Sequence, residues 1–62
     1  MGVQVKIFDE EHEEDLEIKV NKFLKNDIDS KNFIDIKYSV AAFSSPTGDQ
    51  IYCYSAIVIF KE

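Results

Sequence analysis

The chain contains 62 residues, of which 45% are hydrophobic and 31% charged, and its formal net charge is −5. A hydrophobic fraction of this size is typical of a folded protein, and the length predicts a single domain over residues 1–62 with a small core. All seven basic residues are lysines, so the chain lacks the arginine-containing basic stripe of DNA- and RNA-binding proteins. Composition therefore excludes disorder and general nucleic-acid binding.

The start of the chain and the length of its apolar runs predict a cytoplasmic protein that does not insert into a membrane. No apolar run approaches the length of about 18 residues that a membrane helix requires. The opening MGVQVKIF is charged and alternating, unlike a signal peptide. The single cysteine, Cys53, cannot form a disulfide within one chain. We therefore expect such a small domain to gain stability by oligomerisation.

The first half of the chain predicts a strand followed by a helix. Residues 3–8 alternate in polarity, as a strand does. Asp9 stands where a helix N-cap belongs, and the glutamates of residues 10–14 favour the positive end of a helix dipole. The helix is expected from about residue 10 to about residue 26, with an apolar stripe that faces a sheet: Leu16, Val20, Phe23 and Leu24.

The acidic run and the lone histidine both have structural explanations. Seven of the twelve acidic residues lie between Asp9 and Glu17, and the start of a helix accounts for them. Paired carboxylates also serve acid–base catalysis and metal binding, but no cluster of histidine or cysteine accompanies these. His12, one turn before Leu16, is expected to pack or to cap the helix. We predict no catalytic residue, no metal site and no cofactor, and hence no enzyme.

The second half of the chain predicts a β-hairpin. Two strands are expected at about residues 33–43 and 50–60, and the loop SSPTGD joins them. In the earlier strand the expected core face is Ile34, Ile36, Tyr38, Val40 and Ala42. The order strand, helix, strand, strand predicts an α+β fold of βαββ type. The sheet is expected to be three-stranded and antiparallel, with the last strand central and the helix on one face.

The last strand, QIYCYSAIVIF, is apolar or aromatic on both of its faces. One row is Ile51, Cys53, Ser55, Ile57 and Ile59, and the other is Tyr52, Tyr54, Ala56, Val58 and Phe60. A single helix covers one face, and the pattern leaves open which row it covers. The other face needs a second cover, for which the sequence favours another copy of the protein, a ligand, or both.

Three segments carry a resemblance to a known family: KIFDEEHEEDLEIKVNKFL, FIDIKYSVAAF and DQIYCYSAIVIFK. Over about residues 3–61 the chain resembles the very short sporulation-associated proteins of Bacillus and relatives, which are also abundant in phages of these bacteria. Residues 34–39 and 54–60 are the most specific parts. The resemblance implies production in the mother cell for bacterial members and in the host cytoplasm for phage members, and it implies no molecular activity.

Small phage proteins of this size and design include immune-evasion sponges, which sequester cyclic nucleotide signals of the antiphage CBASS defence without cleaving them. Bases need flat apolar partners, and phosphates need a cation or oriented donors. The residues that suit such a ligand are Lys6, Lys37, Tyr38, Ser39, Phe43, Ser45, Thr47, Tyr52 and Tyr54. The alternative for the tyrosines is packing in a core or interface, and for Lys37 a solvated strand position.

Two hypotheses of different classes follow from these residues. The first is a non-catalytic homo-oligomeric sponge that binds a cyclic dinucleotide or a related signal at a subunit interface. The second is a structural or protein-interaction component of the mother cell, whose exposed sheet face binds itself or a protein partner. The first hypothesis predicts that the purified protein retains a bound nucleotide. The second predicts a protein partner and no bound nucleotide.

Overall fold

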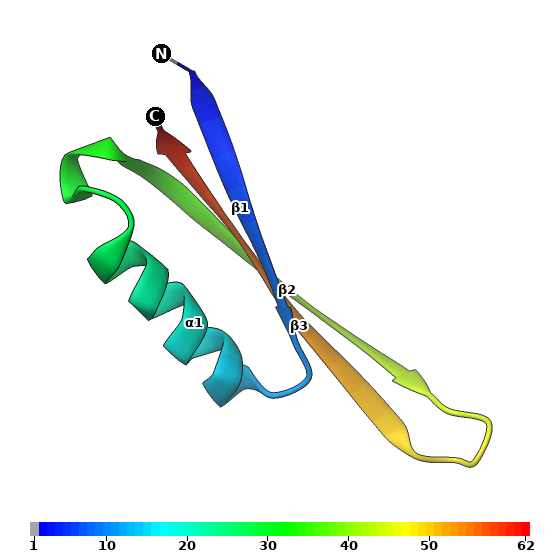
Figure 1. Ribbon diagram of the computed structural model, residues 1–62. Coiled ribbons are helices and arrows are strands. Elements are labelled where there is room, and N and C mark those ends of the chain that lie inside the picture. Colours follow the sequence, from blue (N-terminus) through cyan, green and yellow to red (C-terminus); the bar gives the residue numbers. More distant parts are fainter. Residues whose placement is uncertain (1) are drawn as a thin grey trace.

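The computed structural model describes residues 2–62. Across them the chain forms strand β1 (Val3–Glu10), helix α1 (Glu13–Asn26), the short 3-10 helix η1 (Ser30–Asn32), and strands β2 (Phe33–Ser44) and β3 (Gln50–Lys61). The strands make one antiparallel sheet in the order β1-β3-β2, and α1 lies against one face of it (Figure 1). This confirms the predicted α+β fold with a central last strand.

The start of the helix differs from the sequence prediction. Asp9 and Glu10 belong to β1, because β3 continues opposite them and pairs them with Ser55 and Tyr54. The helix begins at Glu13, and its N-cap is His12, which has extended backbone angles and makes no side-chain cap hydrogen bond. The prediction of a helix from about residue 10 with Asp9 as its N-cap was therefore wrong. The strand ladder satisfied the backbone of these residues instead.

The core lies between α1 and the middle of β3. The buried residues of the described chain are Leu16 and Val20 of α1 and Ala56 and Val58 of β3. The row that contains Tyr52, Tyr54 and Phe60 therefore faces the helix, which settles the point that the sequence left open. Around this centre pack Phe8, Phe23, Leu24, Ile28, Tyr54 and Phe60.

Aromatic rings and one ion pair fix the helix to the sheet. The Phe23 ring packs edge to face against Phe8, with centroids 5.7 Å apart, and against Phe60 at 5.4 Å. Such pairs contribute about 0.5–1.5 kcal/mol each beyond the area that they bury. The Lys19 ammonium donates to the Glu10 carboxylate, and this hydrogen bond raises the pKa of Lys19. The middle of α1 is thus tied to the end of β1.

Helix α1 covers β1 and β3 but leaves β2 open. Ile36, Tyr38 and Val40 point to the helix side of the sheet because they pair with Val58, Ala56 and Tyr54. They nevertheless remain 39%, 58% and 53% exposed. The prediction that this face of the strand belongs to the core was wrong, because α1 packs against β1 and β3.

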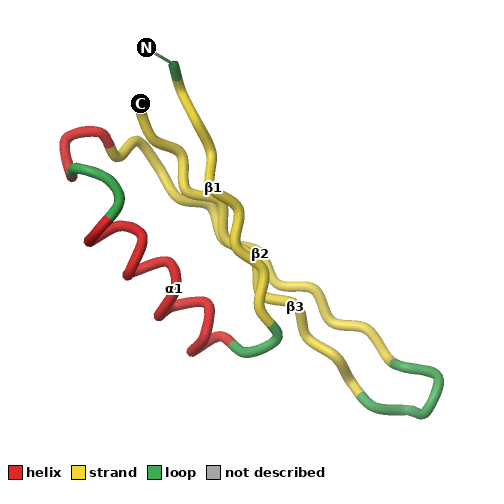
Figure 2. Tube along the Cα trace, in the orientation of Figure 1, coloured by secondary structure: helices red, strands yellow, loops and turns green. Residues whose placement is uncertain are grey.

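The β2–β3 hairpin extends well beyond the rest of the molecule, as Figure 2 shows. Strand β1 pairs with β3 only as far as Tyr54, so residues 41–53 form a two-stranded arm. At its tip the Ser45 amide donates to the Asp49 carbonyl at 2.7 Å, and Gly48 has a φ of 91°. Glycine suits this left-handed angle because it has no Cβ. The arm makes the molecule long and thin, with extents of 47 × 19 × 11 Å.

Candidate interaction surfaces

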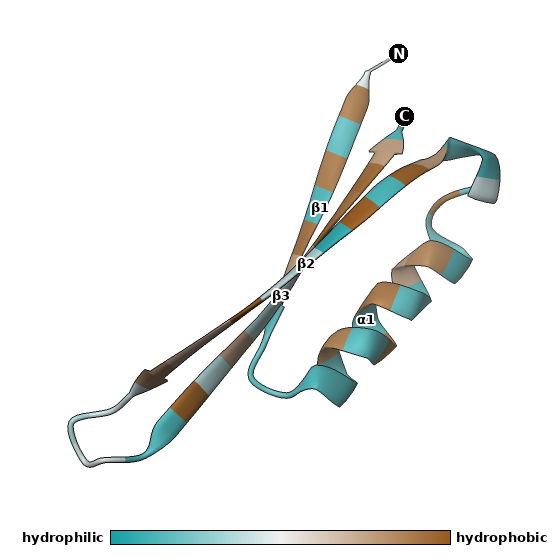
Figure 3. Cartoon of the chain, turned by 180° about the vertical axis from the view of Figure 1, so that it is seen from behind, coloured by the Kyte–Doolittle hydropathy of each residue, from teal (hydrophilic) through white to brown (hydrophobic). Residues whose placement is uncertain are grey.

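The face of the sheet opposite α1, which we call the open face, carries an apolar block. The block comprises Val3, Val5 and Ile7 of β1 beside Ile57 and Ile59 of β3. The three β1 side chains are 65%, 57% and 60% exposed, although their strand has the alternating pattern that normally buries one face. Figure 3 shows this alternation as bands of opposite hydropathy along β1. The apolar set of β1 thus faces away from the helix and has no cover within the described chain.

Polar residues border the apolar block on two sides. Across the sheet, Asp9, Ser55 and Ser39 form one row, and the Ser55 hydroxyl donates to Asp9 Oδ1 at 2.6 Å. Along β2, Asp35 and Lys37 flank Ile59 and Ile57, and their charged groups are 3.7 Å apart. Both charged side chains are exposed. The block is therefore an apolar patch with one charged edge that carries both signs.

A groove runs along the other face, between α1 and the uncovered side of β2. Its apolar lining comes from Leu16 and Val20 of the helix and from Ile36, Tyr38 and Ala56 of the sheet. Its volume is about 530 Å³, and its polar rim is formed by Glu13, Glu14, Glu17 and Asn21. We call this hollow the helix-side groove. It exists because α1 does not reach over β2.

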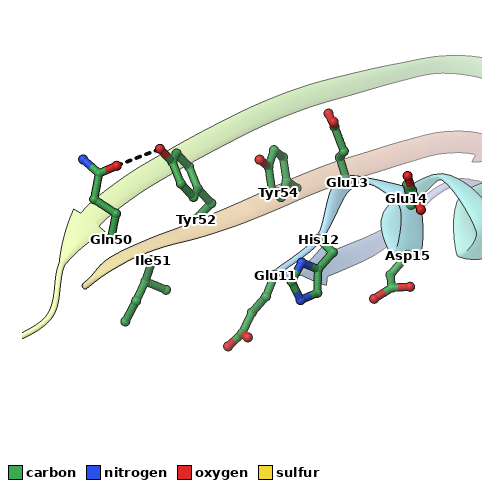
Figure 4. Close-up of a pocket in the computed structure, with 9 residues that line it drawn as sticks. All are labelled: Glu11, His12, Glu13, Glu14, Asp15, Gln50, Ile51, Tyr52 and Tyr54. Carbon is green, nitrogen blue, oxygen red and sulfur yellow. Dashed lines mark hydrogen bonds between the residues drawn. The ribbon is translucent and has the colours of Figure 1, made fainter.

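A second hollow lies next to the groove, where β1 ends and the arm begins. Figure 4 shows Tyr52 and Tyr54 on one side of β3 there and Ile51 on the other. The two tyrosine rings stack at 6.2 Å between centroids, and the Tyr52 hydroxyl donates to Gln50 Oε1 at 2.8 Å. Desolvation of the Tyr54 phenol, with the nearby Glu13 carboxylate, raises the pKa of that tyrosine. Glu13 and Glu14 line both hollows, which are therefore neighbours.

The charges along the two hollows are predominantly negative. The linings contain five acidic residues and no lysine; the acids are Glu11, Glu13, Glu14, Asp15 and Glu17. Opposite charges attract and like charges repel across such a surface, so it favours cationic partners over anionic ones. The aromatic side chains that would suit a base thus lie beside carboxylates.

The structure divides the residues selected for a nucleotide ligand between two faces. Tyr38, Tyr52 and Tyr54 lie on the helix side of the sheet, whereas Lys37, Ser39 and Phe43 lie on the open face. Lys6 is on the helix side of β1, where its ammonium lies 5.9 Å from the centre of the Phe8 ring. Ser45 and Thr47 lie in the tip of the arm and hydrogen-bond each other at 2.9 Å. The tyrosines come together, but the lysines and hydroxyls do not join them within one chain.

The acidic rim of the groove was missed as a site feature because the helix dipole already explained it. Glu13 and Glu17 are four residues apart, so they lie along one flank of the stripe that contains Leu16 and Val20. This spacing was the signal that they border a surface. The exposure of Ile36 had no signal in the sequence, because it depends on where α1 sits across the sheet.

Comparison with known proteins identifies the family of this chain. The model of the family described as "Sporulation protein Cse60" matches residues 2–62. The chain belongs to this family. The sporulation protein Cse60 of Bacillus subtilis (strain 168) is 47% identical over 60 residues, which cover 97% of this chain and 98% of the relative. The sequence resemblance is thereby confirmed. No solved structure matches the chain.

The names of the family and of the relative refer to sporulation and to no reaction. The name of the relative states sporulation and nothing about a substrate, ligand or partner. Within residues 2–62, no helix is long and apolar enough to cross a membrane. The exposed apolar block and the helix-side groove are the surfaces of the described residues that offer apolar contact to a partner.

Proposed function

We propose that this Cse60-family chain is a non-catalytic protein-interaction component of sporulating cells, acting in the mother cell. The observation that carries the proposal is the helix-side groove, where an apolar floor lies under an acidic rim. Proteins bind peptides most readily where apolar contact area is combined with charges that orient the partner. The occupant is a protein segment with both apolar and basic residues.

The uncovered edge of β2 adds a way to hold such a segment. Strand β2 is at the edge of the sheet, so one side of its backbone has no strand partner in the described chain. An extended segment can pair with such an edge through backbone hydrogen bonds and place alternate side chains on each face. On the helix side those side chains would lie beside Ile36 and Tyr38 and close to Glu17. We therefore expect the alternate side chains that face the helix to include both apolar and basic residues.

Peptide binding tests the chemistry of this proposal. Two labelled peptides of equal length, with threonine at every second position, are titrated by fluorescence anisotropy. The positions between the threonines alternate valine with lysine in one peptide and valine with glutamate in the other, so both residue types share one face. We expect the lysine peptide to bind and its affinity to fall by about three- to tenfold in Glu17→Lys, because a favourable charge becomes a repulsive one. Asp29→Lys, outside the groove with the same charge change, is the matched control. Equal loss in both variants would contradict the groove as the binding site.

Crosslinking in sporulating cells tests the biological side. A photoreactive residue in place of Tyr38 is expected to give a defined adduct with another protein, and Glu17→Lys is expected to weaken that adduct. The same residue in place of Lys22, which faces away from Val20 on the helix, is expected to give none. Native mass spectrometry of the purified protein completes the test. A retained cyclic nucleotide would overturn the proposal in favour of the sponge.

A further inference from the structure

The chain exposes more surface than a compact monomer of its mass. Its accessible surface is 4900 Å², whereas a folded monomer of 7.2 kDa typically exposes about 4,100 Å². The excess is about 800 Å², which is the share that each partner contributes to a standard protein interface. Its radius of gyration is 14.0 Å, against about 11 Å expected for this length. The extended arm contributes to both excesses, together with the uncovered apolar block of the open face.

We propose that the open face binds a second copy of this chain, sheet against sheet, with the strands of the two copies antiparallel. This inference is independent of the helix-side groove, which lies on the other face of the sheet. Two sheets pack face to face about 10 Å apart when each presents apolar side chains. The charges around the apolar block are arranged so that they complement a second copy of the same face. A second copy of the chain is therefore the partner that the open face fits.

The register fixes two neighbouring rows at the centre of the open face. One row runs across the sheet as Val5, Ile59, Asp35, and the next as Ile7, Ile57, Lys37. Each row has two apolar residues on β1 and β3 and a charge on β2. The charges of the two rows are opposite in sign.

Consider a two-fold axis that is parallel to the sheets, perpendicular to the strands, and located between these two rows. This axis places the first row of one copy over the second row of the other copy, and the second row over the first. The apolar pairs then meet apolar pairs, with Val5 opposite the second copy's Ile7. Asp35 lies opposite Lys37 of the second copy, and Lys37 opposite its Asp35. These contacts are near the axis, so the usual angle of about 30° between packed sheets displaces them little. Every charge at the centre gains an opposite charge.

The other symmetric arrangement lacks this match. A two-fold axis parallel to the strands would place β1 of one copy over β2 of the other. Val5 would then face Asp35, and Ile7 would face Lys37. That arrangement covers apolar side chains with charges and removes those charges from water without adding an opposite charge across the interface, which is unfavourable. Self-complementarity therefore selects both the partner and its orientation.

Association of the purified full chain is measured by sedimentation velocity across a concentration series. We expect the wild type to form a dimer, and Val5→Glu to raise its dissociation constant at least about 100-fold, because a charge would be buried against Ile7 of the second copy. Ile18→Glu, at a helix position of similar exposure, is the control and is expected to dimerise like the wild type. Circular dichroism confirms that each variant is folded. A wild type that stays monomeric, or a dimer lost in Ile18→Glu and kept in Val5→Glu, would overturn the proposal.

Charge exchange tests the orientation with variants that leave the apolar block intact. Asp35→Lys and Lys37→Asp each replace two attractive contacts by repulsive ones, so each alone is expected to dimerise about tenfold more weakly. Mixed together they restore the opposite charges, and native mass spectrometry is expected to show the mixed dimer in excess over either homodimer. A statistical mixture of the three dimers would refute the antiparallel orientation. Binding of the lysine peptide in the groove is expected to persist in all of these variants, so the two proposals fail separately.

Discussion

Val58 is the residue at which the sheet and the helix meet most closely. It has no exposed surface, and it pairs with Lys6 on one side and with Ile36 on the other. Leu16 and Val20 cover it from the helix. With so few buried side chains in the described residues, each one contributes a large fraction of the apolar burial that stabilises the fold.

Val58→Ala is therefore expected to lower the free energy of unfolding by about 2 kcal/mol, through lost burial and the cavity that remains. Ile18→Ala, at a helix residue that is 63% exposed, is expected to change it by less than about 0.5 kcal/mol. Urea unfolding followed by circular dichroism, at equal protein concentration, measures both. Similar losses in the two variants would contradict a core centred on Val58.

Helix α1 begins after an N-cap residue whose side chain does not cap the helix. His12 has φ −127° and ψ 133°, the extended conformation of an N-cap, but no side-chain cap hydrogen bond. The acids of the first turn, Glu13, Glu14 and Asp15, interact favourably with the helix dipole. The helix thus has charge stabilisation at its start but leaves backbone donors without a side-chain acceptor.

His12→Ser is expected to raise the free energy of unfolding by about 0.5–1 kcal/mol, because a serine hydroxyl at this position accepts a hydrogen bond from the first turn. His12→Ala removes the ring without supplying an acceptor, and it serves as the matched control. Comparing the thermal stability of the two variants separates the effect of the added serine cap from the effect of losing the imidazole. A serine variant no more stable than the alanine variant would contradict the assignment of His12 as N-cap.

At the scale of the whole molecule, the half that contains the helix and the arm of the hairpin differ in the packing that stabilises them. The half that includes β1 and α1 has the core, whereas the arm of residues 41–53 is two strands wide. A two-stranded hairpin is of marginal stability in water unless something packs against it. The dimer proposed through the central rows of the open face leaves most of the arm outside the contact.

Amide hydrogen exchange is expected to follow this division. The hydrogen-bonded amides of the arm should exchange faster than those of residues 55–60, because local opening there disrupts little buried surface. Mass spectrometry of peptic fragments of the full chain resolves the two segments of β3. Equal protection of both would show that a further contact covers the arm.

Part of the architecture follows from local patterns in the sequence. Period-two alternation gave the strands, the stripe through Leu16 and Val20 gave the helix, and the SSPTGD loop gave the hairpin. The apolar content of residues 50–60 placed the last strand at the centre. These predictions succeed because they depend on side chains that are only a few residues apart in the sequence.

The tertiary structure alone decided the remaining features, each of which depends on contacts between distant segments. Pairing with β3 kept Asp9 in a strand, although its local sequence favoured a helix cap. The position of α1 over β1 and β3 left Ile36 and Tyr38 exposed, and so created the helix-side groove. Register set Asp35 and Lys37 beside the apolar block. Local patterns thus predict the elements and the residues that share each face, whereas the lateral position of one helix and the register of one sheet decide which faces are covered.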